Sequence, residues 1–352
     1  MGKILYVGDN IDQIKSGADS VNKRNITVLN SIFQTSEIII KPLSENTIKD
    51  KLFFYVGGLN QKIEKEILDI LDKDDCIGYV FISHSLLGRL AKSIKKRFGG
   101  KIKIITFFHN VERHYAKEFM KSDGVKHFPF YLWASYNERY ALKFSDVKIV
   151  LNERDNLELE KYYQKKANLI LPATYKDIFE NQKSNEAHPV IDYLFVGTAF
   201  FANLEAIRWF IKNVMPNVSG SLTIVGKEMD TYKDEFENER IKVFGFVNDL
   251  SKYYYESKVV IAPIFSGGGM KTKIAEALMY GKLILGTTEA FEGYVNNQAA
   301  MILCNTADEY IKILNSEEFK NKSLFNSASR DCFINNYENN ITLTKFQSIF
   351  ND

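Results

Sequence analysis

The sequence predicts an α/β protein made of two doubly wound domains, each a parallel β-sheet covered by helices. Two observations indicate this architecture. The chain has 352 residues, which exceeds the roughly 250 to 300 at which a single hydrophobic core stops growing, so two domains are expected. Short β-branched or aromatic runs also alternate with helical stretches along most of the chain, which is typical of repeated βα units.

The composition excludes several classes of protein. Hydrophobic residues make up 45% and charged residues 26% of the chain, so neither disorder nor a fibrous repeat is expected. The formal net charge of +2 does not indicate nucleic-acid binding. Three distant cysteines, Cys76, Cys304 and Cys332, indicate neither a disulfide framework nor a zinc site. No segment approaches the roughly 18 to 20 apolar residues of a membrane span, and no signal peptide precedes the first strand, so we expect a cytoplasmic protein.

Residues 1–175 are predicted to form the first domain. Its strands are expected at 3–8, 38–41, 77–83, 102–108, 147–151 and 168–172. Helices are expected from about Ser20, at 61–72, in the basic stretch after the third strand, and near 130–144. Each strand is a short β-branched or aromatic run, which is the basis of its assignment.

The polar stretch 176–189 lacks apolar periodicity and is predicted to link the domains. The second domain, 190–337, repeats the pattern, and the segment 338–352 is expected to pack back on the first domain. Strands are expected at 191–196, 221–225, 241–246, 259–264 and 283–287, and helices at 203–215, 249–257, 270–280 and beyond about 306. Ligands of such sheets bind at the carboxyl ends of the strands, where the two domains should face a cleft.

The strongest motif is VVIAPIFSGGGMKTKIAEALMYGKLILGTTEAFEG, residues 259–293. A buried strand leads into Gly267, Gly268 and Gly269, and a helix is expected from about Met270. Glycines let the backbone approach a ligand closely, and the unpaired N–H groups of the first helical turn attract anions, so a phosphate should bind here. Lys271 and Lys273 lie in that first turn. They run against the helix dipole, but they supply the positive charge that a departing diphosphate needs.

Glu276 lies about two turns into the predicted helix, within an otherwise apolar stretch. Helical side chains lean toward the N-terminal end, so its carboxylate could accept both hydroxyls of a ribose bound beneath the glycines. The alternative is a surface glutamate paired with Lys273, an interaction worth a few tenths of a kcal/mol. The residues by themselves leave both interpretations open.

This segment resembles the nucleotide-diphosphosugar glycosyltransferases of the large retaining family four (group 1), which have the two-domain GT-B fold. Members often carry G-G-G-T-R-x-K, then E-A-M-x-x-G, then G-x-E-G. This chain has Gly267-Gly268-Gly269-Met270-Lys271-Thr272-Lys273, then Glu276-Ala277-Leu278 with Gly281, then Ala290-Phe291-Glu292-Gly293. The resemblance continues through FVGTAFFANLEAIRWFIKNVMP with its Asn203, LTIVGK, and VFGFVNDLSKYY.

The resemblance implies a donor site in the second domain. Its residues would be Gly197, Thr198, Lys227, Val247, Gly267, Gly268, Gly269, Met270, Glu292 and Gly293, with Val247 near the nucleobase. Two positions depart from the family pattern. Many members have a basic residue after the glycine of the first donor-domain strand, where this chain has Thr198, and Gly268 replaces a glutamate eight residues before Glu276. Phosphate neutralisation should therefore rest on Lys271, Lys273 and Lys227.

In the first domain, strand 102–108 ends directly at His109, followed by Asn110-Val111-Glu112. A histidine at a strand's carboxyl end should point toward the cleft, although an isolated histidine is more often structural. The H-N-V-E string resembles a family motif whose histidine approaches the donor sugar, which implies a catalytic role for His109. Gly17-Ala18 resembles an acceptor-side glycine loop, but a simple strand-to-helix turn explains it almost as well.

The resemblance implies transfer of a sugar from a UDP- or GDP-linked donor to a hydroxyl of a glycan or lipid-linked acceptor, in bacterial surface polysaccharide or glycoconjugate synthesis. His109, Lys271, Lys273 and Glu276 would be the catalytic residues, and the anomeric configuration would be retained. No cofactor is expected, and no metal, because no DxD-like pair ends a strand. Two alternatives stay open: a nucleotide-sugar epimerase of the same fold, and a noncatalytic partner subunit.

One helix of the first domain is locally basic. Its stretch AKSIKKRFGGK contains Lys92, Lys95, Lys96 and Arg97. We favour a solvated helix face. The alternative is a contact with anionic lipid headgroups, worth about 1 kcal/mol per residue, which would suit a peripheral enzyme on the inner face of the plasma membrane.

Overall fold

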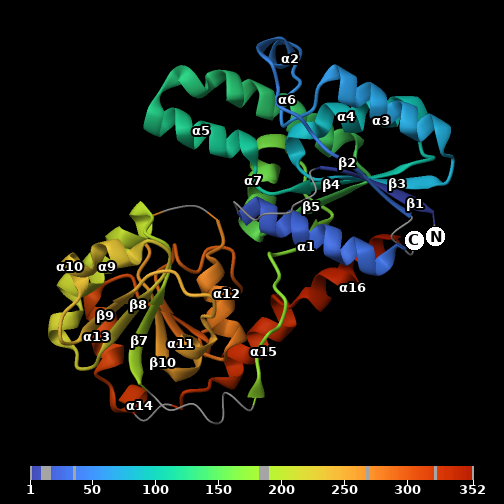
Figure 1. The fold of residues 1–352 in the computed structure, drawn as a ribbon. Coiled ribbons are helices and arrows are strands. Elements are labelled where there is room, and N and C mark those ends of the chain that lie inside the picture. Colours follow the sequence, from blue (N-terminus) through green and yellow to red (C-terminus); the bar gives the residue numbers. More distant parts are fainter. Residues whose placement is uncertain are drawn as a thin grey trace. The chain divides into compact units, whose positions relative to one another are not determined.

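A computed structural model describes residues 2–8, 17–34, 37–181, 190–266, 269–320 and 323–350. The chain divides into two compact units (Figure 1). The first unit joins residues 1–174 to 339–352, and the second comprises residues 175–338. Each unit is built on a six-stranded parallel sheet, which confirms the predicted pair of α/β domains.

The first sheet has the strand order β2-β1-β3-β4-β5-β6, and every neighbouring pair is parallel. Its strands are β1 (Lys3–Val7), β2 (Ile38–Lys41), β3 (Ile77–Ile82), β4 (Lys103–Phe108), β5 (Val147–Val150) and β6 (Leu169–Ile170). The winding direction reverses between β1 and β3, since β2 lies on one side of β1 and all later strands on the other. Ligands of open α/β sheets bind outside the strand ends at such a switch point.

Helices cover both faces of the first sheet (Figure 1). They are α1 (Gly17–Ile32), α2 (Ile48–Leu52), α3 (Gln61–Lys73), α4 (Gly88–Phe98), α5 (Glu112–Asp123), α6 (Phe128–Phe144), α7 (Glu153–Tyr163) and α16 (Asn339–Phe350). Leu5 and Val7 share a core with α3 and α4, whereas Ile4 and Tyr6 share one with α1 and α16. Alternate residues of β1 thus face opposite layers, as the two-residue period of a strand requires.

The C-terminal helix α16 is part of the first unit's core. Phe346 is fully buried, and Ile349 and Phe350 pack in the same cluster. A buried arginine of α1 joins this helix to α16 and to the segment after β6. Arg24 donates to the carbonyl of Pro172 at 2.8 Å and to the hydroxyl of Thr342 at 3.1 Å. The chain therefore returns to its first unit after completing the second.

The second sheet has the order β12-β11-β10-β7-β8-β9 and is also parallel throughout. Its strands are β7 (Ile191–Val196), β8 (Leu222–Val225), β9 (Ile241–Phe244), β10 (Ser257–Ala262), β11 (Leu283–Gly286) and β12 (Met301–Leu303). The helices are α9 (Phe201–Asn213), α10 (Lys233–Phe236), α11 (Ser251–Glu256), α12 (Thr272–Met279), α13 (Ala307–Leu314), α14 (Glu317–Lys320) and α15 (Ser327–Asn336). The switch point of this sheet lies between β7 and β10.

Some elements differ from the sequence-based expectation. The strand β12, with only three residues, was not predicted, and β6 has two residues where five were expected. Helix α1 begins at Gly17, so Gly17 and Ala18 lie in the helix and not in a preceding loop. Of the predicted linker, residues 182–189 lie outside the described part of the chain. Its first residues pack on the second unit, where Asp177 accepts from Arg330 at 2.9 Å.

Replacement of Phe346 by alanine should destabilise the first unit by about 3 to 5 kcal/mol, because it leaves a cavity beneath α16. The two tryptophans lie in different units, Trp133 in the first and Trp209 in the second. Urea unfolding followed by Trp133 fluorescence in a Trp209→Phe background would measure the effect. The exposed neighbour Gln347→Ala is the control, expected within about 0.5 kcal/mol of the parent. Equal midpoints for both variants would contradict the assignment of α16 to this core.

Candidate functional site

The glycine motif of the second unit lies at the switch point of its sheet. Strands β7 and β10 are hydrogen-bonded neighbours, and the chain leaves their carboxyl ends toward α9 and α12. Gly197 directly follows β7, where a Cβ atom would lie only 2.9 Å from the Lys273 Nζ atom and 2.8 Å from the Asn203 amide nitrogen. A larger residue at this position would have to displace the Lys273 and Asn203 side chains.

Lys273 is the central side chain of this site. Its residue is 8% exposed, and its Nζ atom donates to Asn203 Oδ1 at 2.7 Å. The Nζ atom also lies 4.1 Å from the centroid of the Phe195 ring. Burial lowers the pKa of Lys273 to about 7, an effect that Glu276 opposes and Lys271 reinforces. The ammonium group is thus held out of water without a carboxylate within ion-pair distance in the described chain.

Asn203 connects the lysine to the end of β7. Its amide nitrogen donates to the carbonyl of Thr198 at 2.9 Å, while its oxygen accepts from Lys273. Asn203 was among the residues of the family resemblance, but its contact with Lys273 was not predicted from the sequence. An amide that uses its donor and its acceptor in this way fixes the direction of the lysine side chain.

Glu276 lies three residues after Lys273 on α12 and is half-buried. The hydroxyl of Tyr254 donates to its Oε2 atom at 2.7 Å. Burial raises the pKa of Glu276, while the Tyr254 hydrogen bond and the nearby Lys273 lower it. In the described structure Glu276 contacts Tyr254 and Lys273 contacts Asn203, and the two residues form no ion pair with each other. The alternative of a surface glutamate paired with Lys273 is therefore wrong. The Tyr254 contact engages one of the two carboxylate oxygens.

Lys271 differs from its expected position in the first helical turn. Helix α12 begins at Thr272, two residues later than expected, and Lys271 is its N-cap residue. Its Nζ atom donates to the Gly269 carbonyl at 2.7 Å and to Glu289 at 2.9 Å, and Glu292 lies 4.0 Å away. This lysine is therefore already neutralised by carboxylates, and Glu292 lies beside it as part of that cluster.

The remaining predicted donor residues lie around the same strand ends. Gly269 and Gly293 have φ angles of +78° and +81°, a conformation that favours glycine. Met270 and Val247 are half-buried against the core, and the side chains of Thr198 and Lys227 are exposed. The Lys227 carbonyl accepts the Ala199 N–H at 2.9 Å, which ties the loops after β7 and β8 together. Gly267 and Gly268 lie outside the described residues.

In the first unit, His109 lies at the end of β4 and is 8% exposed. Its Nε2 atom lies 3.0 Å from the Asn22 side-chain oxygen of α1. Burial lowers the pKa of His109 to about 3, with further contributions from His84 and Arg24. The imidazole is therefore neutral near pH 7, and Ala18 lies exposed one turn before Asn22 on the same helix.

Glu138 of α6 supports the turn that follows His109, a role that sequence analysis missed. Its carboxylate accepts the backbone N–H groups of Glu112 at 2.6 Å and Arg113 at 3.2 Å, and the Tyr163 hydroxyl at 2.6 Å. Burial raises the pKa of Glu138 to about 8, while the Tyr163 hydrogen bond opposes this shift. The sequence contained one indication of this role. Glu138 is a carboxylate on the buried face of an aromatic helix, between Ala134 and Ala141.

The basic face of α4 is largely paired. Lys95 forms an ion pair with Asp146 at 2.6 Å, Arg97 pairs with Asp72, and the Lys92 Nζ atom lies 4.1 Å from the Tyr140 ring centroid. This arrangement favours the solvated helix face. Within the described segments, no helix combines the length and apolar character needed to cross a membrane.

The buried lysine predicts a pH-dependent stability. Lys273 has a folded-state pKa of about 7 against an ordinary value of 10.5, so unfolding takes up a proton between these values. Its contribution to the free energy of unfolding should therefore rise with pH across this window, by up to about 1.4 kcal/mol per pH unit. Urea unfolding at several pH values, followed by Trp209 fluorescence in a Trp133→Phe background, would measure the slope.

Replacement of Lys273 by methionine should lower that slope, because methionine does not titrate. The remaining slope should include the contribution of Lys282, whose pKa burial lowers to about 8. The matched control is Lys212→Met, which changes an exposed lysine of α9 and should keep the slope of the parent protein. Identical slopes in the parent and Lys273→Met would show that the buried lysine does not titrate in this window.

Comparison with known proteins agrees with the motif resemblance. Residues 191–315 match the family model described as glycosyl transferases, group 1, which covers most of the second unit. No curated protein sequence matches the chain.

Solved structures similar to the chain extend over nearly its whole length. Anabaena Alr3699/HepE in complex with UDP has a TM-score of 0.66 at 11% identity, covering 99% of both chains. Sucrose-phosphate synthase from Thermosynechococcus elongatus has a TM-score of 0.65 at 10% identity, covering 99% of this chain and 98% of that one. The lipopolysaccharide outer core galactosyltransferase WaaB has a TM-score of 0.64 at 12% identity, covering 99% of both. The chain therefore has the GT-B fold, and its second unit carries the group 1 glycosyltransferase match that its motifs predicted.

Proposed function

We propose that the chain transfers a sugar from a nucleoside-diphosphate donor to a hydroxyl of a glycan or lipid-linked acceptor, with retention at the anomeric carbon and without a metal. The observation that carries this proposal is the buried Lys273 at the switch point of the second sheet, held by Asn203 beside Gly197. Solved structures of the similar Alr3699/HepE contain UDP or UDP-glucose, which favours a UDP-linked donor. Bacterial surface polysaccharide or glycoconjugate synthesis is the proposed setting.

The proposed mechanism is mainly electrostatic. The diphosphate lies at the start of α12, where the N–H groups of the first turn and the Lys273 ammonium stabilise the negative charge that grows as the glycosidic bond breaks. The sugar becomes oxocarbenium-like as this bond lengthens. Glu276 receives the ribose hydroxyls through the oxygen that Tyr254 leaves unused.

The two lysines of the motif contribute unequally in this proposal. Among the described residues, Lys273 contacts only an amide oxygen and a ring face, so a phosphate would improve its environment. Lys271 must give up part of its contact with Glu289 to reach the same phosphate. His109 takes part as a neutral hydrogen-bonding group toward the sugar, because burial keeps its imidazole uncharged.

The proposal includes a cytoplasmic location, with peripheral contact of α4 at the inner face of the plasma membrane as the alternative to a solvated helix face. Because Lys95 and Arg97 are paired with carboxylates, each should contribute less than the roughly 1 kcal/mol of an unpaired basic residue near anionic lipid. The exposed Lys96 then makes the largest contribution.

UDP or GDP should stabilise the protein by about 2.7 kcal/mol when present at about 100 times its Kd. Lys273→Ala and Glu276→Ala should each weaken binding on the order of tenfold or more, because each removes a hydrogen bond to a charged group. Lys271→Ala should have a smaller effect than Lys273→Ala. Thermal unfolding and calorimetric titration would measure these effects, with the exposed Lys212→Ala as the control. If neither diphosphate raises the melting temperature, the donor-site proposal fails.

Incubation with a donor, first without and then with an acceptor, separates the transferase from its two alternatives. A transferase should leave the sugar largely bound to its nucleotide or hydrolyse it slowly, whereas an epimerase would convert the sugar without transfer. A noncatalytic partner would bind the nucleotide and give no product with any acceptor. Chromatography of the nucleotide sugars after incubation distinguishes these results.

A further inference from the structure

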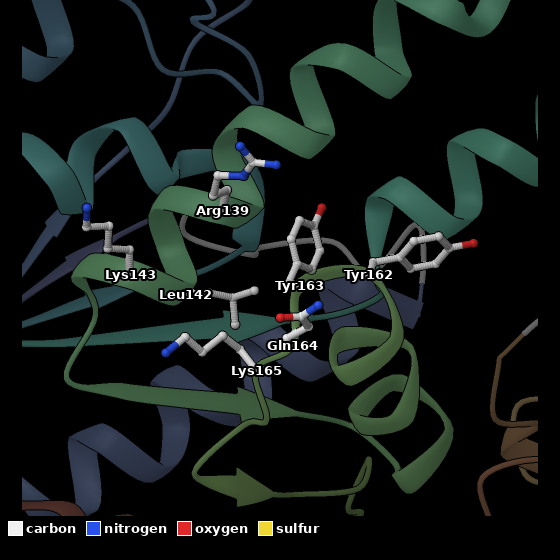
Figure 2. A pocket seen from close by; sticks show the side chains of 7 residues that line it. All are labelled: Arg139, Leu142, Lys143, Tyr162, Tyr163, Gln164 and Lys165. Carbon is white, nitrogen blue, oxygen red and sulfur yellow. The ribbon is translucent and has the colours of Figure 1, made fainter.

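We propose that the first unit binds an anionic group, a phosphate or a carboxylate, in a pocket formed by the C-terminal ends of α6 and α7. The pocket has a volume of about 510 Å³, within the range of small-molecule sites. Figure 2 shows the side chains that line it: Arg139, Leu142 and Lys143 come from α6, and Tyr162 to Lys165 come from the end of α7 and the residues directly after it. The site lies within one unit and does not depend on the proposed function of the other.

Three cations line this pocket, and no carboxylate does among the described residues. Arg139, Lys143 and Lys165 form no ion pair in the described part of the chain, although two lysines next to the pocket do. Lys161 pairs with Glu158 at 3.3 Å, and Lys166 pairs with Glu160 at 3.1 Å. Surface carboxylates therefore pair with the neighbouring lysines, whereas the three cations that line the pocket have no ion pair among the described residues.

Helix stability accounts for only one of these three charges. A cation in the last turn complements the helix dipole, which explains Lys143 at the end of α6. Arg139 lies more than one turn from that end, and a like-charge pair four residues apart destabilises a helix. Lys165 lies beyond the end of α7. Burial lowers the pKa of Lys148, and the nearby positive charge of Lys165 lowers it further. An anion between the three side chains would relieve both repulsions.

The rest of the wall is rigid and partly aromatic. Leu142 is buried at the base, and the Tyr163 hydroxyl is held by Glu138 at 2.6 Å. The Tyr162 ring is fixed by Arg113, whose guanidinium carbon lies 4.9 Å from the ring centroid. An apolar base, two phenol rings and an arginine that can bind a phosphate with two hydrogen bonds fit a sugar that carries an anionic group, or the phosphate headgroup of a lipid.

The test compares two triple variants of the full chain. The pocket variant is Arg139→Ser, Lys143→Ser and Lys165→Ser. The control, Lys65→Ser, Lys161→Ser and Lys166→Ser, removes three exposed lysines outside the pocket. Hydrogen–deuterium exchange of peptides covering residues 139–144 and 160–166 gives a local signal, so anion binding at the second unit is scored separately on the peptide around Lys273.

The probes distinguish the two sources of the anion. Soluble probes are inorganic pyrophosphate and glucose 1-phosphate, and the lipid probe is a phosphatidylcholine vesicle with or without phosphatidylglycerol. We expect protection of the pocket peptides, with a half-saturation that rises on the order of tenfold in the pocket variant and less than about twofold in the control. Protection by the soluble anions assigns a free anionic sugar, and protection only by vesicles with phosphatidylglycerol assigns a headgroup. Absence of protection by every probe, or equal loss in both variants, overturns the proposal.

Discussion

The proposed chemistry of the second unit depends on one buried amine, that of Lys273. Burial disfavours the charge of Lys273, and an amide oxygen and a ring face offset only part of that cost. A second buried lysine of the same unit shows the contrast. Lys282 donates to three backbone carbonyls, those of Tyr255 and Ser257 at 3.0 Å and Leu324 at 2.9 Å. Lys282 is fully partnered and structural, whereas Lys273 gains from an arriving anion.

The parallel sheet creates the space in which this lysine acts. Next to the switch point, on the other side of β7, the chains leaving β7 and β8 approach so closely that a Cβ atom at Gly226 would lie 1.9 Å from the carbonyl oxygen of Gly197. Two glycines at adjacent strand ends allow the loops to meet, and Asn203 then joins one loop to Lys273. The strand order, the two glycines and the position of the Lys273 amine therefore depend on one another.

Most strands were predictable from the sequence because β-branched runs are a local signal. Strand β7 lies at the predicted residues, whereas the three residues of β12 are too few to form a pattern. The residue types of the site were also predictable, but not their partners. The contacts of Lys273 with Asn203 and of Glu276 with Tyr254 join residues 70 and 22 positions apart. Pairing at such separation is decided by the fold and leaves no periodic trace in the sequence.

The charge states of His109 and Lys273 indicate different roles for the two units in the proposed function. A leaving diphosphate needs positive charge, and His109 cannot provide it near pH 7, because burial holds its imidazole neutral. Glu138 fixes the start of α5 directly after this histidine, which favours a positioned neutral group over a mobile charged one. Lys273, whose pKa of about 7 lies close to neutrality, can instead become fully charged when an anion arrives. In the proposed function, charge stabilisation therefore falls to Lys273 of the second unit, and the H-N-V-E turn of the first contributes neutral hydrogen bonds.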